Sequence, residues 1–237
     1  MLLSFLIEQQ AKLSLMQKEL VVLSELKSQC EQFLFEQKKV PSFSSLLNLN
    51  NDLSILPHYV LDTDYYPIFH KKQQELSQNE DRALEKIFAL FSSPLCDRWK
   101  EVLICKGDDQ FALRTGFYQD EFDIYQSILM GFQGMTLYTE GLDVYQLQYL
   151  TEIARDYSFS LFFVIHNKQE LDCVLETDAP YFILSSFDKK NFSKNNTPLY
   201  HLSPFVPKTA SLFAMGPTDL IKEKKELALL GFSGLIL

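Results

Sequence analysis

The stretch "SLFFVIHNKQELDCVLETDAPYFILSS", residues 160–186, decides the fold. Its two apolar runs, 160–166 and 180–186, flank an amphipathic helix for which Asn167 is the expected N-cap. Continuous apolar runs, rather than alternating ones, are typical of parallel strands that are buried on both faces. The order strand, helix, strand therefore predicts an α/β protein built on a parallel sheet.

The same alternation continues on both sides of this stretch. Strands are also expected at residues 53–61, 87–93, 110–115, 134–138, 210–215 and 233–237. Helices are expected at residues 95–105, 118–132, 143–157, 197–205 and 217–232, with another that ends at 81–86 and one or two long ones over 2–37. The 118–132 helix should be capped by Gln119 or Asp120, and Pro57 weakens the 53–61 strand because proline cannot donate a ladder hydrogen bond.

Eight strands, each except the last followed by a helix, predict a (β/α)8 TIM barrel. We expect one domain over 1–237, with an N-terminal helical extension over 1–40 and the barrel over 53–237. The barrel is expected to be shortened at the C-terminus. An open, doubly wound parallel sheet is the alternative fold.

Composition limits the possible partners. The net charge of −9 argues against a nucleic acid or an anionic membrane, because both bind clustered Lys and Arg. The apolar N-terminus lacks a basic region and becomes polar after seven residues, so it predicts neither a signal peptide nor a membrane span. No cofactor or metal is expected, because the His and Cys residues are scattered and Gly-rich phosphate loops are absent. A cytoplasmic protein with free thiols is expected, at Cys30, Cys96, Cys105 and Cys173.

Residues 111–134, "FALRTGFYQDEFDIYQSILMGFQG", carry a family resemblance. This run resembles the third strand and following helix of indole-3-glycerol phosphate synthase, a barrel of tryptophan biosynthesis. The segments "FFVIHNKQEL", "YFILSSFDKKNF", "SPFVPKTASLFAMGP" and "MQKELVVLSEL" are similar to later strands and to the N-terminal helices of that family. The resemblance covers about residues 111–234, and the matches in the first run are Leu113, Arg114, Phe117, Asp120, Ile124, Tyr125 and Gly131.

The resemblance implies a lyase whose substrate is an anilino-deoxyribulose phosphate. In that family a third-strand Lys is the acid and a fifth-strand Glu is the base of a ring closure that loses CO₂ and then water. Backbone N–H groups after strands seven and eight hold the phosphate. The matching positions here are Thr115 for the Lys, Val164 for the Glu, Ser185-Ser186-Phe187 for a sixth-strand Asn-Asn-Arg, and Met215 before a retained Gly216 for a seventh-strand Ser-Gly.

These substitutions predict that the reaction is impaired or lost. An acid and a base each contribute about 10²–10⁴-fold to a rate, and neither Thr115 nor Val164 can replace them. No first-strand Glu-x-Lys is visible either. The candidate substrate-binding residues are Ser185, Ser186, Gly216 and His166, although serines here satisfy nearby backbone by default and such a His is more often a helix-start or packing residue.

Other polar residues near the strand ends have ordinary explanations. Arg114 should face the helix layer and pair with Asp120 or Asp123, and Asp188 should cap a turn. Lys189 and Lys190 are interpreted as a solvated loop. Glu140 could replace a lost base, but a loop carboxylate is usually just exposed. Bulky apolar groups are expected near the mouth of the barrel, namely Phe162, Phe163, Tyr181, Phe182, Phe187 and Met215. They are interpreted as core residues that would fill the mouth, and the lining of an apolar ligand site is the alternative.

Three functions remain open from the sequence. The first is a synthase-like barrel without catalysis that binds an unknown protein or small ligand. The second is an active carboxy-lyase with relocated catalytic groups and a phosphorylated small-molecule substrate. The third is a different phosphosugar-handling barrel, which the negative charge disfavours. Fold alone does not decide among them.

Overall fold

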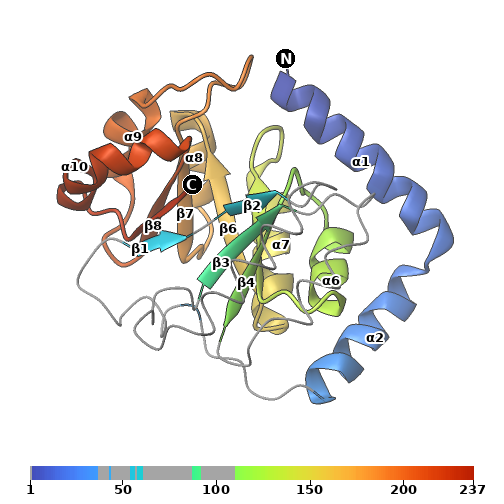
Figure 1. Ribbon diagram of the computed structural model, residues 1–237. Helices are drawn as coiled ribbons and strands as arrows, with labels where there is room; N and C mark the ends of the chain where they lie inside the picture. The colour runs from blue at the N-terminus through green and yellow to red at the C-terminus, as the bar shows by residue number, and fades with distance from the viewer. Residues whose placement is uncertain (1, 37–42, 44–53, 57, 61–86, 92–109) are drawn as a thin grey trace.

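The computed structural model describes residues 2–36, 43, 54–56, 58–60, 87–91 and 110–237 (Figure 1). The helices predicted at 95–105 and up to 81–86 lie outside these residues, as do Cys96 and Cys105. Residues 37, 53, 57, 61, 92 and 93 of other predicted elements also lie outside, and the rest of those elements can be compared with the structure.

A curved, entirely parallel sheet forms the centre of the molecule, with its strands in the order β1-β9-β8-β7-β6-β5-β4-β3-β2. The parallel α/β class predicted from the apolar runs is therefore confirmed. The larger strands are β3 Ile87–Phe91, β4 Phe111–Thr115, β5 Gly134–Tyr138, β6 Ser160–Ile165, β7 Tyr181–Ser185, β8 Ser211–Met215 and β9 Gly234–Ile236.

The strand predicted at 53–61 is present as two short strands on either side of position 57. β1, Ser54–Leu56, pairs with β9, and β2, His58–Val60, pairs with β3. Pro57, which is expected to weaken this strand, lies outside the described residues. Segments one residue apart in the chain thus stand at opposite ends of the strand order.

Helices follow the strands and cover the outer face of the sheet (Figure 1). The predicted N-terminal helical region consists of two helices, α1 and α2, which lie against α6 on one flank. The helices are α1 Leu2–Leu20, α2 Leu23–Glu36, α6 Glu121–Leu129, α7 Val144–Asp156, α8 Lys168–Leu175, α9 Thr197–Leu202 and α10 Lys224–Leu229, with 3-10 turns η2 Ser203–Phe205 and η3 Thr218–Glu223.

The prediction of one helix at 217–232 is wrong, because its first half is the 3-10 turn η3. Of the six residues of η3 only Leu220 is buried, and no side chain caps its start. The six residues of α10 also have a single buried member, Leu227, so burial does not explain why only the first half is a 3-10 turn.

Local capping explains where the better-defined helices begin. Asp120 caps α6, and its side chain accepts a hydrogen bond from the backbone of Phe122. Asn167 caps α8 as predicted, through a 2.9 Å bond from the backbone N–H of Glu170. After α6 the chain reverses at Gly131, whose φ of +84° is a conformation that glycine adopts without strain. Gly131 is one of the residues that match the family, and the backbone conformation alone explains why a glycine stands there.

Two apolar clusters lie on the two faces of the sheet, and alternate residues of each strand enter one or the other. In β6, Phe162 and Val164 belong to the inner cluster, whereas Phe163 faces the helices. Phe43 stands in the inner cluster with its ring edge-on to Phe162, at a centroid distance of 4.8 Å. The inside of the curved sheet is therefore packed with side chains rather than hollow at this level.

The six bulky residues all pack in or against the two apolar clusters, as core filling predicts, but the expected place at the mouth is wrong for four of them. Phe163 and Phe182 face the helix layer. Phe162 and Tyr181 do face inward, but their rings stack on each other at 4.6 Å near Phe43, and Tyr181 is the first residue of β7, far from the mouth. The sequence alone does not show on which face of the sheet a side chain lies, because that depends on the register of the strand.

Candidate functional site

The strands end together at one rim of the sheet, where parallel α/β proteins usually place their sites. Four of the positions taken from the family resemblance lie there: Thr115 at the end of β4, Val164 near the end of β6, Ser185 at the end of β7 and Met215 at the end of β8. All four are at least nine-tenths buried. Phe187 lies in the following loop and packs, half-buried, on the inner cluster.

This set of residues carries no acid or base. Val164 and Met215 are members of the inner apolar cluster, and the hydroxyl-bearing Thr115 is 2% exposed. Two hydroxyls and two apolar side chains can pack and can make hydrogen bonds. They cannot supply a proton at neutral pH or balance a developing charge.

Ser185 forms a hydrogen bond with nearby backbone, as the sequence predicts for a serine at this place. Its hydroxyl accepts a 3.2 Å hydrogen bond from the backbone N–H of Phe187 and so stabilises the turn after β7. Ser186 is also buried, but its hydroxyl has no hydrogen-bond partner among the described residues. The hydroxyl lies only 2.1 Å from where a side-chain carbon on Gly216 would stand. Gly216 is therefore required here by close packing.

The region where the family holds a phosphate is occupied by internal contacts. The backbone N–H of Gly216 donates to the carbonyl of Ile236 at 3.2 Å. The next turn, η3, brings two carboxylates, and Lys194 is already bound to both, at 3.1 Å from Asp219 and 3.0 Å from Glu223. A phosphate would have to displace these contacts.

A group of ionisable side chains gathers at the same rim, from the loops after β5, β6 and β7. Lys189 forms ion pairs with Glu170 and, at 3.4 Å, with Glu140. The interpretation of Lys189 as a solvated loop residue is therefore wrong, and Glu140 is held in place. We call Glu140, His166, Glu170 and Lys189 the rim cluster.

Glu170 is the anionic centre of the rim cluster. Burial alone would raise its pKa, but hydrogen bonds from His166 and Lys189 outweigh burial and lower the pKa to about 2. The His166 backbone N–H donates to Glu170 Oε2 at 2.7 Å, and its ring Nδ1 lies 3.5 Å from the same oxygen. His166 thus has the helix-start and packing role that the sequence favours, with its ring tilted against Tyr138.

Arg114 faces the helix layer, as predicted. Its guanidinium donates to Gln126 and Ser127 on α6, both at 2.9 Å, and lies 4.3 Å from the ring centre of Tyr118. Burial raises the pKa of Asp123 to about 6, and the positive charge of Arg114 opposes that rise. Arg114 therefore joins β4 to α6 and is turned away from the strand-end rim.

The N-terminal helix covers the rim. Leu3 is fully buried in the inner cluster, and its backbone N–H donates to the carbonyl of Lys189 at 3.0 Å. The Ser4 hydroxyl donates to Glu140 Oε1 at 2.8 Å. The sequence predicts an N-terminal helix but not that it packs over the rim. These contacts join residues more than 130 positions apart in the chain. Sequence reasoning had also missed Glu170, although it stands in the first turn of a capped helix directly after a strand.

Comparison with known proteins supports the predicted relationship. No family model matches the chain. An indole-3-glycerol phosphate synthase from Chlorobium phaeobacteroides is 32% identical over 95 residues, which are 40% of this chain and 37% of that protein. One from Pelodictyon phaeoclathratiforme is 30% identical over 118 residues, or 50% of this chain and 45% of that protein. The chain resembles the indole-3-glycerol phosphate synthases. It spans less than half the length of these curated relatives, and the predicted resemblance is confirmed over that part.

Solved structures agree on the fold alone. A deoxyribose phosphate aldolase from Aeropyrum pernix superposes with a TM-score of 0.58 at 10% identity, over 88% of this chain and 92% of that one. A thiamine phosphate pyrophosphorylase from Pyrococcus furiosus gives a TM-score of 0.53 at 13% identity, over 77% and 85%. At such low identity the likeness extends to the arrangement of strands and helices only.

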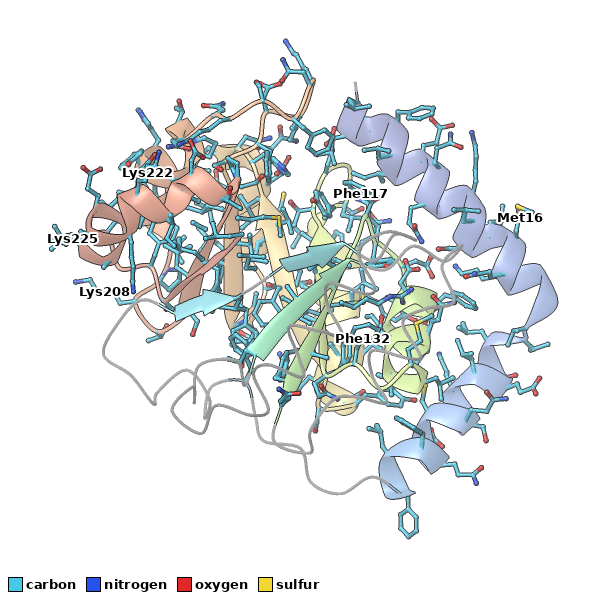
Figure 2. All side chains as sticks on the ribbon, viewed as in Figure 1. Met16, Phe117, Phe132, Lys208, Lys222 and Lys225 are labelled. Atoms are coloured by element: carbon cyan, nitrogen blue, oxygen red, sulfur yellow. The ribbon has the colours of Figure 1, made fainter. Side chains whose placement is uncertain are left out.

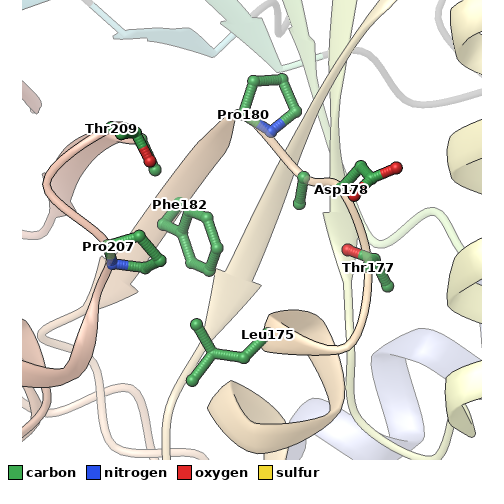
Figure 3. Close-up of a pocket in the computed structure, with 9 residues that line it drawn as sticks. Leu175, Thr177, Asp178, Pro180, Phe182, Pro207 and Thr209 are labelled. Atoms are coloured by element: carbon green, nitrogen blue, oxygen red, sulfur yellow. The ribbon is translucent and has the colours of Figure 1, made fainter.

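A separate pocket lies at the opposite end of the sheet, where β7 and β8 begin (Figure 3). It has a volume of about 370 Å³, and its walls are both apolar and polar, with Leu175, Phe182 and Pro207 on one hand and Thr177, Asp178 and Thr209 on the other. In the described part of the chain, no three His, Cys, Asp or Glu residues are grouped so as to hold a metal ion. Nor does that part contain a helix long and apolar enough to cross a membrane.

Proposed function

We propose that this chain is a divergent barrel of indole-3-glycerol phosphate synthase descent that no longer performs the family reaction and acts by binding. The observation that carries the proposal is the strand-end set itself. Thr115, Val164, Ser185 and Met215 are buried there, and none of them can act as an acid or a base. The partner is a protein or small ligand in the cytoplasm.

The proposal includes a closed (β/α)8 barrel. Its support is the pairing of β1 with β9 and of β2 with β3. Counted together as one strand, β1 and β2 are the first of eight, and they border both the second and the last. A closed barrel removes the exposed edges that an open sheet has.

The rim cluster favours a second candidate, an active lyase with relocated catalytic groups. Lys189 Nζ lies 3.4 Å from Glu140 Oε2, so a cationic acid and a carboxylate stand together after β5 and β7. Two features oppose this function. The ionised Glu170 holds the Lys189 ammonium, and Glu140 already accepts a hydrogen bond from Ser4 of α1. We therefore rank it second.

The two functions are separated by an activity assay with the anilino-deoxyribulose phosphate, in which formation of the indole product is followed by fluorescence. Our proposal expects no turnover above background, and turnover at the rate of the family would contradict it. A slow rate would be assigned to the rim cluster only if Glu140→Gln and Lys189→Ala abolish it while Lys190→Ala does not.

A further inference from the structure

The first two turns of α1 occupy the mouth of the curved sheet. Leu3 and Ile7, one turn apart on the helix, are 0% and 9% exposed and pack in the inner cluster with Val164 and Met215. Phe117, a half-buried residue of this cluster, stands between α1 and the strand ends (Figure 2). The helix therefore fills space above the strands with its own apolar side chains.

The polar contacts of this segment resemble those of a bound ligand. The Ser4 hydroxyl donates to Glu140, and the Leu3 backbone donates to the Lys189 carbonyl. Even so, Glu140 Oε2 and the buried Nδ1 of His166 have only long ion-pair contacts, 3.4 Å to Lys189 and 3.5 Å to Glu170. Neither atom makes a hydrogen bond among the described residues. Buried polar atoms are rarely left in this state, so the rim cluster retains hydrogen-bonding capacity that α1 does not use.

The second half of α1 is attached differently. The Ser14 hydroxyl donates to Asp123 Oδ1 at 2.9 Å, and Lys18 pairs with Asp120 at 2.7 Å. These contacts join α1 to α6, outside the mouth. The first two turns can therefore leave the mouth by local fraying while the rest of the helix stays on α6.

We propose that residues 2–7 are a displaceable plug over a ligand site at the mouth. The site takes a small neutral molecule with an aromatic or branched apolar body and one hydrogen-bond donor. The apolar body replaces Leu3 and Ile7, and the donor replaces the Ser4 hydroxyl on Glu140. An anion is disfavoured because it would face that carboxylate. The plug goes beyond the proposed function and does not rest on it, since it would equally gate an active lyase.

The test uses the full chain with Leu3→Asp, which places a charge in the inner cluster and opposes closure. Met16→Asp is the matched control, because Met16 lies on the same helix but is 63% exposed and points away from the sheet (Figure 2). Two quantities are measured: amide exchange over residues 2–10, and binding of 4-methylphenol, a neutral ring with one donor, by ligand-observed NMR.

For Leu3→Asp we expect exchange over residues 2–10 to accelerate by about tenfold or more, with α6 unchanged, because the plug then opens locally. Its affinity for 4-methylphenol should rise by a similar factor, and Met16→Asp should match the unmodified protein in both measurements. Unchanged exchange, or faster exchange with no gain in binding, overturns the proposal. If Leu3→Asp shows no cooperative unfolding, Leu3→Ala, which only removes the packing, is judged by the same two measurements.

Discussion

At the scale of single residues, Ser186 and Gly216 pack closely at the rim, because the Ser186 hydroxyl lies 2.1 Å from where a Cβ on residue 216 would stand. The backbone of Ser186 is held on both sides, since its N–H donates to Met215 and its carbonyl accepts from Asn195. The serine therefore cannot move away, and the position opposite has room only for glycine.

Gly216→Ala should lower the free energy of unfolding by about 1–3 kcal/mol, the usual cost of overpacking a core. Ser186→Ala alone should be neutral or slightly stabilising, because it removes a buried hydroxyl without a partner. Urea denaturation of both single variants and the double variant tests this. Equal costs of Gly216→Ala in the two backgrounds would show that the serine is not the obstacle.

Glu170 gives a residue-scale prediction about pH. Its folded-state pKa of about 2 lies below the ordinary value of 4.5, so its stabilising contribution is complete above pH 4.5 and is lost as the pH falls toward 2. Glu170→Gln should therefore cost about 1–3 kcal/mol at pH 7 and less at pH 3. Unfolding free energies at the two pH values provide the measurement.

Glu176→Gln is the control for this pH effect, because Glu176 is exposed at the end of the same helix. It should change stability little at either pH. A Glu170→Gln cost that stayed constant between pH 7 and pH 3 would mean that the carboxylate charge is not what stabilises the rim cluster.

At the scale of elements, α6 is joined to α1 by the residue that also starts it. Asp120 caps α6 and pairs with Lys18 on α1 at 2.7 Å. Asp143 caps α7 by the same capping-box arrangement, through its bond from the backbone N–H of Gln146. The two aspartates therefore share the role of N-cap, and they differ in the ion pair that Asp120 makes with Lys18.

Asp120→Ala should destabilise the protein by about 1 kcal/mol for the lost cap, with at most about 1 kcal/mol more for the half-exposed ion pair. Asp143→Ala should show the cap contribution alone. Thermal or urea unfolding, repeated in a Lys18→Ala background, measures the difference. If Lys18→Ala leaves the cost of Asp120→Ala unchanged, the pair contributes nothing to holding α1.

At the scale of the whole molecule, β9 is the strand that joins the last part of the chain to the first. It lies between β8 and β1, with Leu235 facing the helices and Ile236 facing the inner cluster. Both residues are fully buried. Stability at this seam therefore depends on segments 180 residues apart in sequence, since Ser54 pairs with Gly234 (234 − 54 = 180).

Ile236→Ala should cost about 2–4 kcal/mol, because it removes a fully buried side chain from a packed interior. It should also speed amide exchange in β1, which pairs with β9. Leu229→Ala, at a position 89% exposed, should have little effect on either quantity. Urea unfolding and hydrogen exchange test both. A large loss of stability with unchanged exchange in β1 would argue against a seam at this point.

Much of the fold was predictable because its signals are local. The apolar runs, Asn167 as a cap, and the residue positions at the strand ends all follow from neighbours in the chain. The face of the sheet on which a side chain lies was less predictable, because it depends on the register between strands. The wrong placement of Phe163 and Phe182 shows this. For the site, the sequence predicted only that the catalytic positions of the resembled family are substituted.

The sequence by itself determined the order of strands and helices, the parallel sheet, and the absence of an acid or base at Thr115 and Val164. Those properties depend on residue type and on spacing along one segment. Only the tertiary structure brought Lys189 to Glu140 and Glu170, and Leu3 into the mouth. Such meetings depend on how the parallel strands curve and on where α1 packs, and no local pattern encodes a contact such as Ser4 with Glu140, 136 residues apart.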